Sequence, residues 1–260
     1  MDRIVNPGEA VSSLRLILLA GTLSQGGAEK QLVYVARALK EMGVAVRLFS
    51  LTRGEYYEAS LDAIGLHPIW VGRSSSPLIR LLTVTYLAMN FHPHILQAWH
   101  FYTNLYVSLL PRLRSGSLGV GGIRGNLFHE VEANGRWSRW LLQVPDVLVT
   151  NSYAGKKNTV HFGVNEHKVH VLPNVIDLQE FDQQVDKHIS VYSNAGQFVV
   201  ITVARLIRVK RLERFIGALA LARQQVPGLV GWIIGDGPER LQLEAEADRL
   251  GLLPEGLRFW

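Results

Sequence analysis

The chain of 260 residues contains no cysteine. Disulfides, thiolate nucleophiles, zinc knuckles and iron–sulfur clusters are therefore excluded, and such a sequence suits a reducing compartment. Long hydrophobic runs are missing as well. The most apolar segments are residues 14–20, which no basic leader precedes, and residues 77–90, which contain Arg80. Both are shorter than the ~20 residues of a transmembrane helix, so we predict neither a signal peptide nor a membrane span.

Acidic residues are absent from residues 63–129, although the chain has 22 in total and a net charge of +5. If the arginines of this block share one face, the local potential favours phosphates, anionic lipids or nucleic acids. The competing interpretation is that buried strands and helices need few charges. The arginines concerned are Arg73, Arg80, Arg112, Arg114 and Arg124.

Short apolar runs alternate with segments of helical period, a pattern typical of βα units around a mainly parallel sheet. The clearest expected helix covers residues 27–42, with Gly43 as its C-terminal cap. The strands expected in a first domain are residues 14–20, 44–51, 67–71, 94–99, 117–123, 146–150 and 168–172.

The pattern breaks at residues 175–196, which hold few large apolar side chains, and there we place a domain boundary. Residues 1–185 form the first domain and residues 186–260 begin a second. The second is expected to have strands at 197–204 and 229–235, helices at 211–226 and 238–250, and a third strand from Leu257. A doubly wound sheet usually has about 4–6 strands, so the sequence predicts that the second domain is incomplete.

Three turns that follow strands are candidates for ligand binding. Gly26 and Gly27 open the first helix, whose N-terminus suits an anion, although glycines in a tight turn equally serve the backbone. This turn has neither the G-x-G-x-x-G nor the P-loop spacing. In the second turn, Arg205 and Lys210 could clamp a diphosphate, or could belong to a solvated basic turn. The third turn runs over residues 235–238, Gly-Asp-Gly-Pro.

These turns, together with residues 172–177, Leu-Pro-Asn-Val-Ile-Asp, occur in the order seen in a known family. The chain resembles the GT-B glycosyltransferases of family 4, a retaining group that uses nucleotide-sugar donors in bacterial polysaccharide and glycolipid assembly. The resemblance covers nearly all of the chain from Leu14 onward. It implies an α/β fold with two Rossmann-like doubly wound domains, the first on the acceptor side and the second for the nucleotide sugar.

The resemblance also implies roles for individual residues. Arg205 and Lys210 are the expected catalytic cations, which neutralise the donor diphosphate as it leaves. The expected donor and phosphate contacts are Gly26, Gly27, Gly235 and Gly237. No metal and no other cofactor is expected, because fixed cations and helix N-termini stabilise the leaving group in such enzymes.

The chain departs from the family pattern at several positions. Asn174 begins Asn-Val-Ile-Asp where many members have Asn-Gly-Val-Asp, and Arg124 stands where a histidine often follows a strand. Arg124, Asn174 and His100 are candidate acceptor or cleft residues. His100 and His129 are the available imidazoles, and we expect structural or acceptor-positioning roles for them rather than proton transfer.

The family's pair of glutamates separated by seven residues has no counterpart in the chain. We therefore expect the chain to be C-terminally truncated and to be weak or inactive alone.

Residues 135–142, Gly-Arg-Trp-Ser-Arg-Trp-Leu-Leu, space two arginines and two tryptophans three apart. A helix would place the arginines together and the tryptophans together, as suits a membrane interface that carries a lipid-linked acceptor. Packing of the tryptophans against the sheet is the alternative, and we favour it slightly.

The sequence thus predicts an enzyme that moves a sugar from a nucleotide-diphosphate sugar to a polysaccharide or lipid-linked acceptor in cell-surface glycan synthesis. A GT-B nucleotide-sugar epimerase and a non-catalytic accessory subunit or fragment are the alternatives. The expected location is the cytoplasm, with peripheral contact at the inner face of the membrane. Nucleic acid is not an expected partner, because the basic residues are scattered and no recognised module is present.

Overall fold

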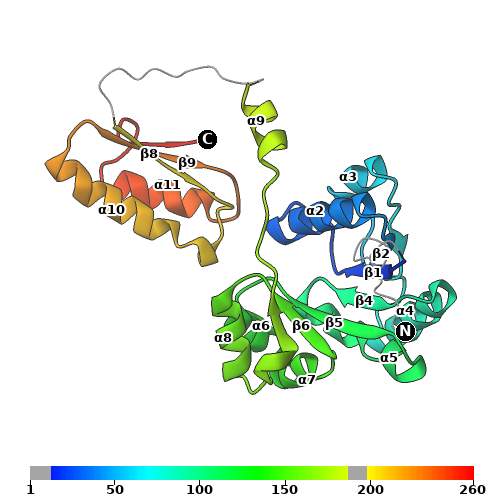
Figure 1. The fold of residues 1–260 in the computed structure, drawn as a ribbon. Helices are drawn as coiled ribbons and strands as arrows, with labels where there is room; N and C mark the ends of the chain where they lie inside the picture. The colour runs from blue at the N-terminus through cyan, green and yellow to red at the C-terminus, as the bar shows by residue number, and fades with distance from the viewer. Residues whose placement is uncertain (1–12, 187–197) are drawn as a thin grey trace. The chain divides into compact units, whose positions relative to one another are not determined.

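The computed structural model describes residues 13–186 and 198–260. The chain divides into two compact units, Met1–Gln183 (unit 1) and Gln184–Trp260 (unit 2). Figure 1 shows the elements of both units, which are described separately below. The domain boundary predicted near residue 185 lies beside this division, and part of the segment that suggested it lies outside the described residues.

Unit 1 is built on a parallel sheet of seven strands in the order β3-β2-β1-β4-β5-β6-β7. The order reverses between β1 and β4, and this is the position at which open α/β sheets bind ligands. The strands are β1 (Arg15–Ala20), β2 (Ala45–Ser50), β3 (Ile69–Trp70), β4 (Ile95–Ala98), β5 (Leu118–Ile123), β6 (Val147–Thr150) and β7 (Val169–Val171).

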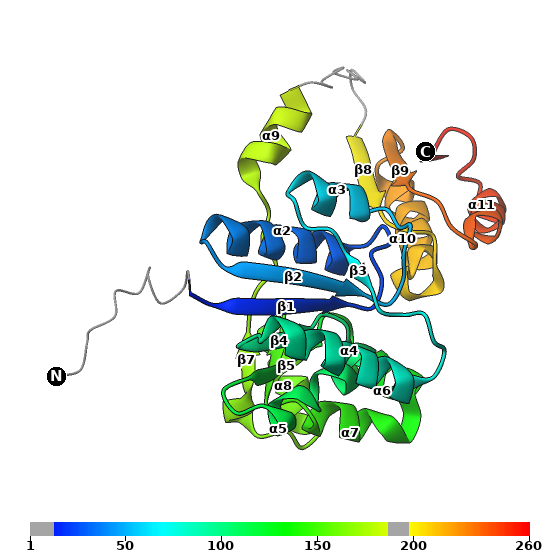
Figure 2. The ribbon, with the colours of Figure 1, turned by 90° about the vertical axis from the view of Figure 1, so that its right-hand side faces the viewer.

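Helices cover both faces of this sheet, because each crossover between parallel strands is right-handed and the strand order changes direction after β3. Helices α2 (Gly27–Glu41) and α3 (Glu58–Ala63) lie on one face, as Figure 2 shows. The elements on the opposite face are α4 (Pro77–Phe91), η1 (Phe101–Val107), α5 (Leu110–Leu113), α6 (Leu127–Asn134), η2 (Gly135–Trp137), α7 (Ser138–Gln143) and α8 (Tyr153–His161). The short η3 (Glu166–Lys168) precedes β7, and α9 (Leu178–Asp186) follows it.

Strand β1 contributes to the core on both of its faces. Leu16 and Leu18 pack with α2, whereas Ile17 and Leu19 pack with α4 and η1 on the other side. A strand that is buried on both faces has no polar alternation. This explains why the sequence shows a continuous apolar run there.

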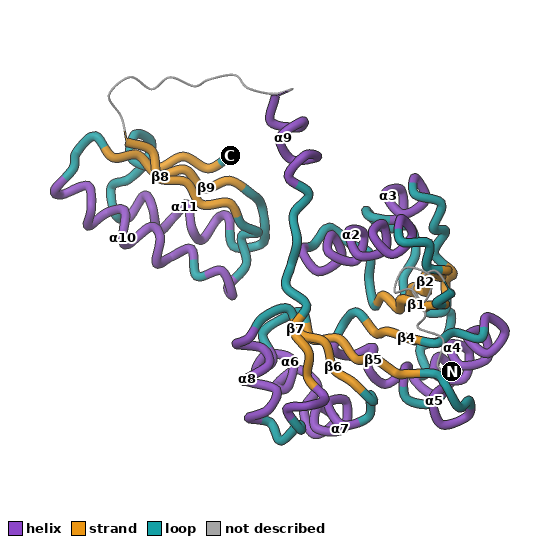
Figure 3. The backbone as a smooth tube through the Cα atoms, in the orientation of Figure 1, coloured by secondary structure: helices purple, strands orange, loops and turns teal. Residues whose placement is uncertain are grey.

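Unit 2 has a parallel sheet of three strands in the order β10-β9-β8. Figure 3 shows its strands in orange and its helices in purple. The elements are β8 (Phe198–Val203), η4 (Arg208–Lys210), α10 (Leu212–Gln225), β9 (Leu229–Ile234), α11 (Arg240–Arg249) and β10 (Leu257–Phe259). Every strand expected from the sequence is therefore present. Helix α11 begins at Arg240. Pro238 therefore lies before the helix, whereas the sequence predicted that it lies in the first turn.

Two glycines of unit 2 offer a matched test of its packing. Gly217 lies inside α10, and a Cβ there meets no atom within 4 Å. Gly217→Ala should raise the free energy of unfolding of unit 2 by about 0.5–1 kcal/mol. A Cβ on Gly231 in β9 would press on the buried side chains of Leu219 and Leu257. Gly231→Ala should lower the same free energy by about 1–3 kcal/mol.

Native-state hydrogen exchange at the β9 amides measures both effects in the intact chain. Equal effects of the two substitutions would contradict this packing.

Candidate active site

The carboxyl ends of three neighbouring strands of unit 1 bring predicted residues to one edge of the sheet. Strands β1, β4 and β5 are adjacent, and Gly21, His100 and Arg124 follow their last residues. The turn between β1 and α2, residues 21–27, lies at this edge. The structure thus places the glycine turn, His100 and Arg124 at the reversal of strand order.

The start of the glycine turn is held by side chains from two other loops. The N–H of Gly21 donates to Nδ1 of His100 at 3.0 Å, and the N–H of Leu23 donates to the carboxylate of Glu55. The ring of Tyr102 lies directly over Gly21, so a Cβ at that position would collide with the Tyr102 hydroxyl. A larger residue would have to displace the Tyr102 ring, so glycine allows this ring to pack against the turn.

Glu29 stands in the first turn of α2, where Gly26 is the N-cap residue. Its Oε1 lies 3.2 Å from Nε2 of His100 and 3.4 Å from the hydroxyl of Thr22. Burial alone would raise the pKa of Glu29, but the hydrogen bonds from His100 and from its own backbone N–H outweigh burial and lower that pKa. The carboxylate is therefore ionised, and it lies against Gly26 at the N-terminus of α2, where the helix dipole favours a negative charge.

Both ring nitrogens of His100 are engaged. Nδ1 accepts a hydrogen bond from Gly21, so the ring proton resides on Nε2 and is donated to Glu29. The imidazole also stacks on Tyr102, with 5.7 Å between the ring centroids. This arrangement positions the glycine turn and leaves no free ring nitrogen to accept a proton.

Arg124 has an unusual environment for a charged side chain. Its guanidinium lies 4.0 Å from the centroid of the Trp99 ring, and Nη1 donates to the carbonyl of Leu172 at 3.5 Å. Within the described residues, Nε and Nη2 are buried without a hydrogen-bond partner, and burial lowers the pKa of Arg124 to about 10. Unpaired guanidinium N–H groups are suited to binding a carboxylate or phosphate.

The loop that contains Asn174 returns from β7 to the side of α2. The side chain of Gln31 donates to the carbonyl of Val175 at 2.7 Å and accepts from its N–H at 2.8 Å. Arg37 forms an ion pair with Glu180 at 3.1 Å, and Asp177 accepts from the N–H of Glu180 near the start of α9. These contacts hold the exposed Asn174 near α2.

Gln31 and Arg37 were missed from the sequence. They lie on the long helix without a recognisable motif, and their partners are more than 140 residues away.

The two turns of unit 2 are joined through their backbones. The N–H of Leu206 donates to the carbonyl of Asp236 at 2.9 Å, and the N–H of Glu239 donates to that of Leu206 at 3.0 Å. A Cβ on Gly235, at φ 137°, would strike the carbonyl of Ala204, and one on Gly237 would strike that of Leu206. Gly235 and Gly237 therefore allow their turn to pack closely against the loop that carries Arg205 and Lys210. These catalytic candidates have exposed side chains, and Lys210 ends η4.

The aromatic segment at residues 135–142 forms η2 and α7 rather than one continuous helix. Trp137 and Trp140 lie together as expected, with ring centroids 6.5 Å apart. The favoured interpretation, that they pack against the sheet, was wrong, because 61% of Trp137 and 44% of Trp140 is exposed. The second imidazole considered, His129, is exposed on α6 and lies 3.9 Å from Glu132.

Comparison with known proteins identifies the family. Residues 25–180, more than half of the chain, match the model of Glycosyltransferase Family 4. The chain belongs to glycosyltransferase family 4. Residues 184–255 match the model described as Glycosyl transferases group 1. Gly26 and Gly27 lie within the first matched segment, and Arg205, Lys210 and the turn at residues 235–238 lie within the second.

A curated relative is the lipopolysaccharide core biosynthesis glycosyltransferase LpsD of Rhizobium meliloti, which is 24% identical over 234 residues. The alignment covers 88% of this chain and 61% of LpsD, so the chain spans less than two thirds of that relative.

Among solved structures, Anabaena Alr3699/HepE in complex with UDP-glucose matches with a TM-score of 0.73 at 18% identity. The lipopolysaccharide outer core galactosyltransferase WaaB in its apo form matches with a TM-score of 0.67 at 15% identity. Both matches cover 95% of this chain and 68% of the other. At such identities the likeness shows the fold, and that fold is GT-B.

The pH dependence of the stability difference between the wild type and Glu29→Gln should show that this carboxylate is ionised. Because the folded-state pKa of Glu29 is lowered, its ionised form stabilises the protein above its ordinary pKa of 4.5. That contribution is lost as the pH falls through the folded-state value. The wild type should therefore be more stable than Glu29→Gln at neutral pH, and the difference should shrink below about pH 4.5. Urea unfolding from about pH 3 to about pH 8 measures it. A difference independent of pH would contradict an ionised Glu29.

Arg124→Met should make the protein more stable. The substitution removes two buried nitrogen atoms that lack hydrogen-bond partners and keeps an apolar side chain against Trp99. We expect a gain of about 1 kcal/mol in the free energy of unfolding, measured with urea. Arg112→Met is the matched control, because Arg112 is exposed, and its effect should stay within about 0.5 kcal/mol. Destabilisation by Arg124→Met would show that the guanidinium is satisfied in the free protein.

Proposed function

We propose that the protein is a retaining glycosyltransferase that moves a sugar from a nucleotide-diphosphate sugar to a glycan or lipid-linked acceptor. The observation that carries this proposal is a pair of glycine-containing strand-to-helix regions, one in each unit of a family 4 chain. HepE was solved with UDP-glucose, and LpsD is named for lipopolysaccharide core biosynthesis. Both names support a nucleotide-sugar donor and a cell-surface glycan acceptor.

The main requirement of this reaction is stabilisation of the leaving group. The bond between the anomeric carbon and the phosphate oxygen breaks, and its electron pair leaves with the nucleoside diphosphate. The acceptor oxygen bonds to the same carbon, and its proton leaves with the released diphosphate. Arg205 and Lys210 supply fixed positive charge to the departing phosphates, and Gly235 and Gly237 border the nucleotide. This assignment needs no metal and no further cofactor.

On the acceptor side, Gly26 and Gly27 let the donor sugar and phosphates approach the start of α2. His100 orients this turn, and Asn174 lies near the same helix. Arg124 binds an anionic group of the acceptor, because its Nε and Nη2 are buried without partners in the described residues. Because Arg124 lowers the stability of the folded protein, we expect it to have a role in function.

The acceptor also sets the place of action that we propose, which is the cytoplasmic face of a membrane. Within the described residues, no helix has both the length and the apolar character needed to cross a bilayer.

The test replaces each of the two cationic residues separately in the full-length protein. Arg205→Ala and Lys210→Ala should each lower kcat for sugar transfer by about 10²–10³-fold, because each stabilises charge that develops on the leaving phosphate. The assay follows release of nucleoside diphosphate across a panel of nucleotide sugars with a lipopolysaccharide-type acceptor. Arg258→Ala is the matched control, because Arg258 has the same charge and is exposed on β10.

The same assay separates the alternatives. NMR of the product should show the anomeric configuration of the donor, and inversion would overturn the retaining assignment. Interconversion of nucleotide sugars without an acceptor would identify an epimerase instead. Equal rates for all three variants would remove Arg205 and Lys210 from the mechanism.

A further inference from the structure

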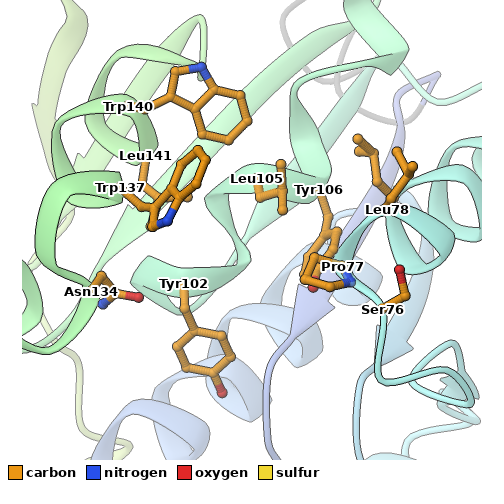
Figure 4. A pocket seen from close by; sticks show the side chains of 11 residues that line it. Ser76, Pro77, Leu78, Tyr102, Leu105, Tyr106, Asn134, Trp137, Trp140 and Leu141 are labelled. Atoms are coloured by element: carbon orange, nitrogen blue, oxygen red, sulfur yellow. The ribbon is translucent and has the colours of Figure 1, made fainter.

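A pocket of about 770 Å³ lies in unit 1 between α4, η1 and the η2–α7 segment. We name it the α4–α7 pocket. Its volume is within the range of ~300–1,000 Å³ that is usual for small-molecule sites. Figure 4 shows its walls, which include Leu78, Leu81, Leu105, Tyr106, Trp137 and Trp140. These side chains are almost entirely aliphatic or aromatic, so the pocket suits a hydrocarbon.

The pocket opens onto an exposed apolar surface. The exposed fraction is 63% for Leu78 and 53% for Leu82, which lies one turn further along α4. Ile79 and Tyr86 continue the exposed apolar residues of this helix. A helix that is apolar on its outer side indicates a ligand or membrane contact. The exposed Trp137 and Trp140 form the opposite wall, and tryptophan is a preferred residue at lipid–water interfaces.

Charges of both signs lie beside the pocket. Arg80 neighbours Leu81 on α4 and donates to the carbonyl of Ser74, and the guanidinium of Arg136 lies 5.6 Å from the Trp137 ring centroid. Where Tyr102 lines the pocket, burial and the carboxylates of Glu29, Glu130 and Glu55 raise the pKa of its hydroxyl to about 12. An anionic head group is therefore favoured near Arg80 and Arg136 rather than near Tyr102.

Tyr102 joins the pocket to the candidate active site. Its ring lines the pocket and also stacks on His100, and its hydroxyl lies against Gly21. The N-terminal end of α4 and the starts of η1 and α6 lie at the carboxyl edge of the sheet, because each of them follows a strand. The pocket therefore lies beside the edge that carries the glycine turn.

We propose that the α4–α7 pocket binds the hydrocarbon chain of an anionic lipid, and that this lipid carries the acceptor. The proposal rests on the proposed function, since it names the class of acceptor that the same site uses. A lipid explains the apolar lining, the exposed apolar rim and the flanking arginines together. A polar glycan alone would leave all three without a function.

The direct test uses monododecyl phosphate below its critical micelle concentration as the probe. Its binding should be saturable, with one molecule per protein, and should change the fluorescence of Trp137 and Trp140. Leu78→Asp should weaken this binding by about 10-fold or more, because it places a charge in the wall of the pocket. Inorganic phosphate at the same concentration should produce no change.

Leu113→Asp is the matched control. It introduces the same charge at an exposed leucine of α5 that neither lines the pocket nor belongs to its apolar rim, so binding of the probe should stay within about twofold of wild type. Circular dichroism checks that both variants are folded. If both weaken binding equally, the loss is a general effect of negative charge and the pocket is not the site. If the probe does not bind, the proposal fails.

Two further measurements separate this proposal from its alternatives. If sedimentation shows a dimer that Leu78→Asp disrupts and the probe does not bind, the pocket instead receives a second copy of the chain. In transfer assays, Leu78→Asp should lower activity with a lipid-linked acceptor and preserve activity with its delipidated glycan. If Leu78→Asp changes activity equally with both acceptors, the pocket proposal is overturned. Saturable probe binding without any transfer by the full-length protein overturns the proposed function and leaves the pocket assigned.

Discussion

The hydrogen bond from the N–H of Gly21 to Nδ1 of His100 determines the geometry of the carboxyl edge of unit 1. It fixes the end of β1 against the end of β4 and sets the tautomer of the imidazole. The Nε2 proton then holds Glu29 at the start of α2. The helix that begins there is consequently oriented by a side chain from a different strand, and its N-terminus has a defined position relative to the sheet.

Arg124 and Tyr102 are the residues at this edge that we propose to lie beside the acceptor. Arg124 is stacked on Trp99, whose indole N–H donates to the carbonyl of Ala28, so the guanidinium is connected to the same helix start. Tyr102 separates the glycine turn from the apolar pocket. An acceptor with an anionic group and a hydrocarbon chain would contact polar and apolar parts of a single rigid surface. Preorganisation of this kind reduces the entropy that binding must overcome.

Sequence patterns predicted the fold well because central strands such as β1 are buried on both faces and give continuous apolar runs. The turn at residues 235–238 was also visible, since its close approach to the backbone of Ala204 and Leu206 requires glycine at Gly235 and Gly237. The contacts that hold the turns were not visible. Gln31 meets Val175 across 144 residues and Glu29 meets His100 across 71, and no local pattern encodes such pairs. The spacing of Trp137 and Trp140 predicted their pairing but not their exposure, which depends on how η2 and α7 meet the sheet.

Strand β8 is at the edge of the described sheet of unit 2, next to β9. Its exposed apolar side chains alternate between both faces: Phe198 and Val200 point to one side, and Ile201 and Val203 to the other. Apolar side chains on both faces of a parallel strand are typical of a strand that is covered on both sides, as β1 is in unit 1.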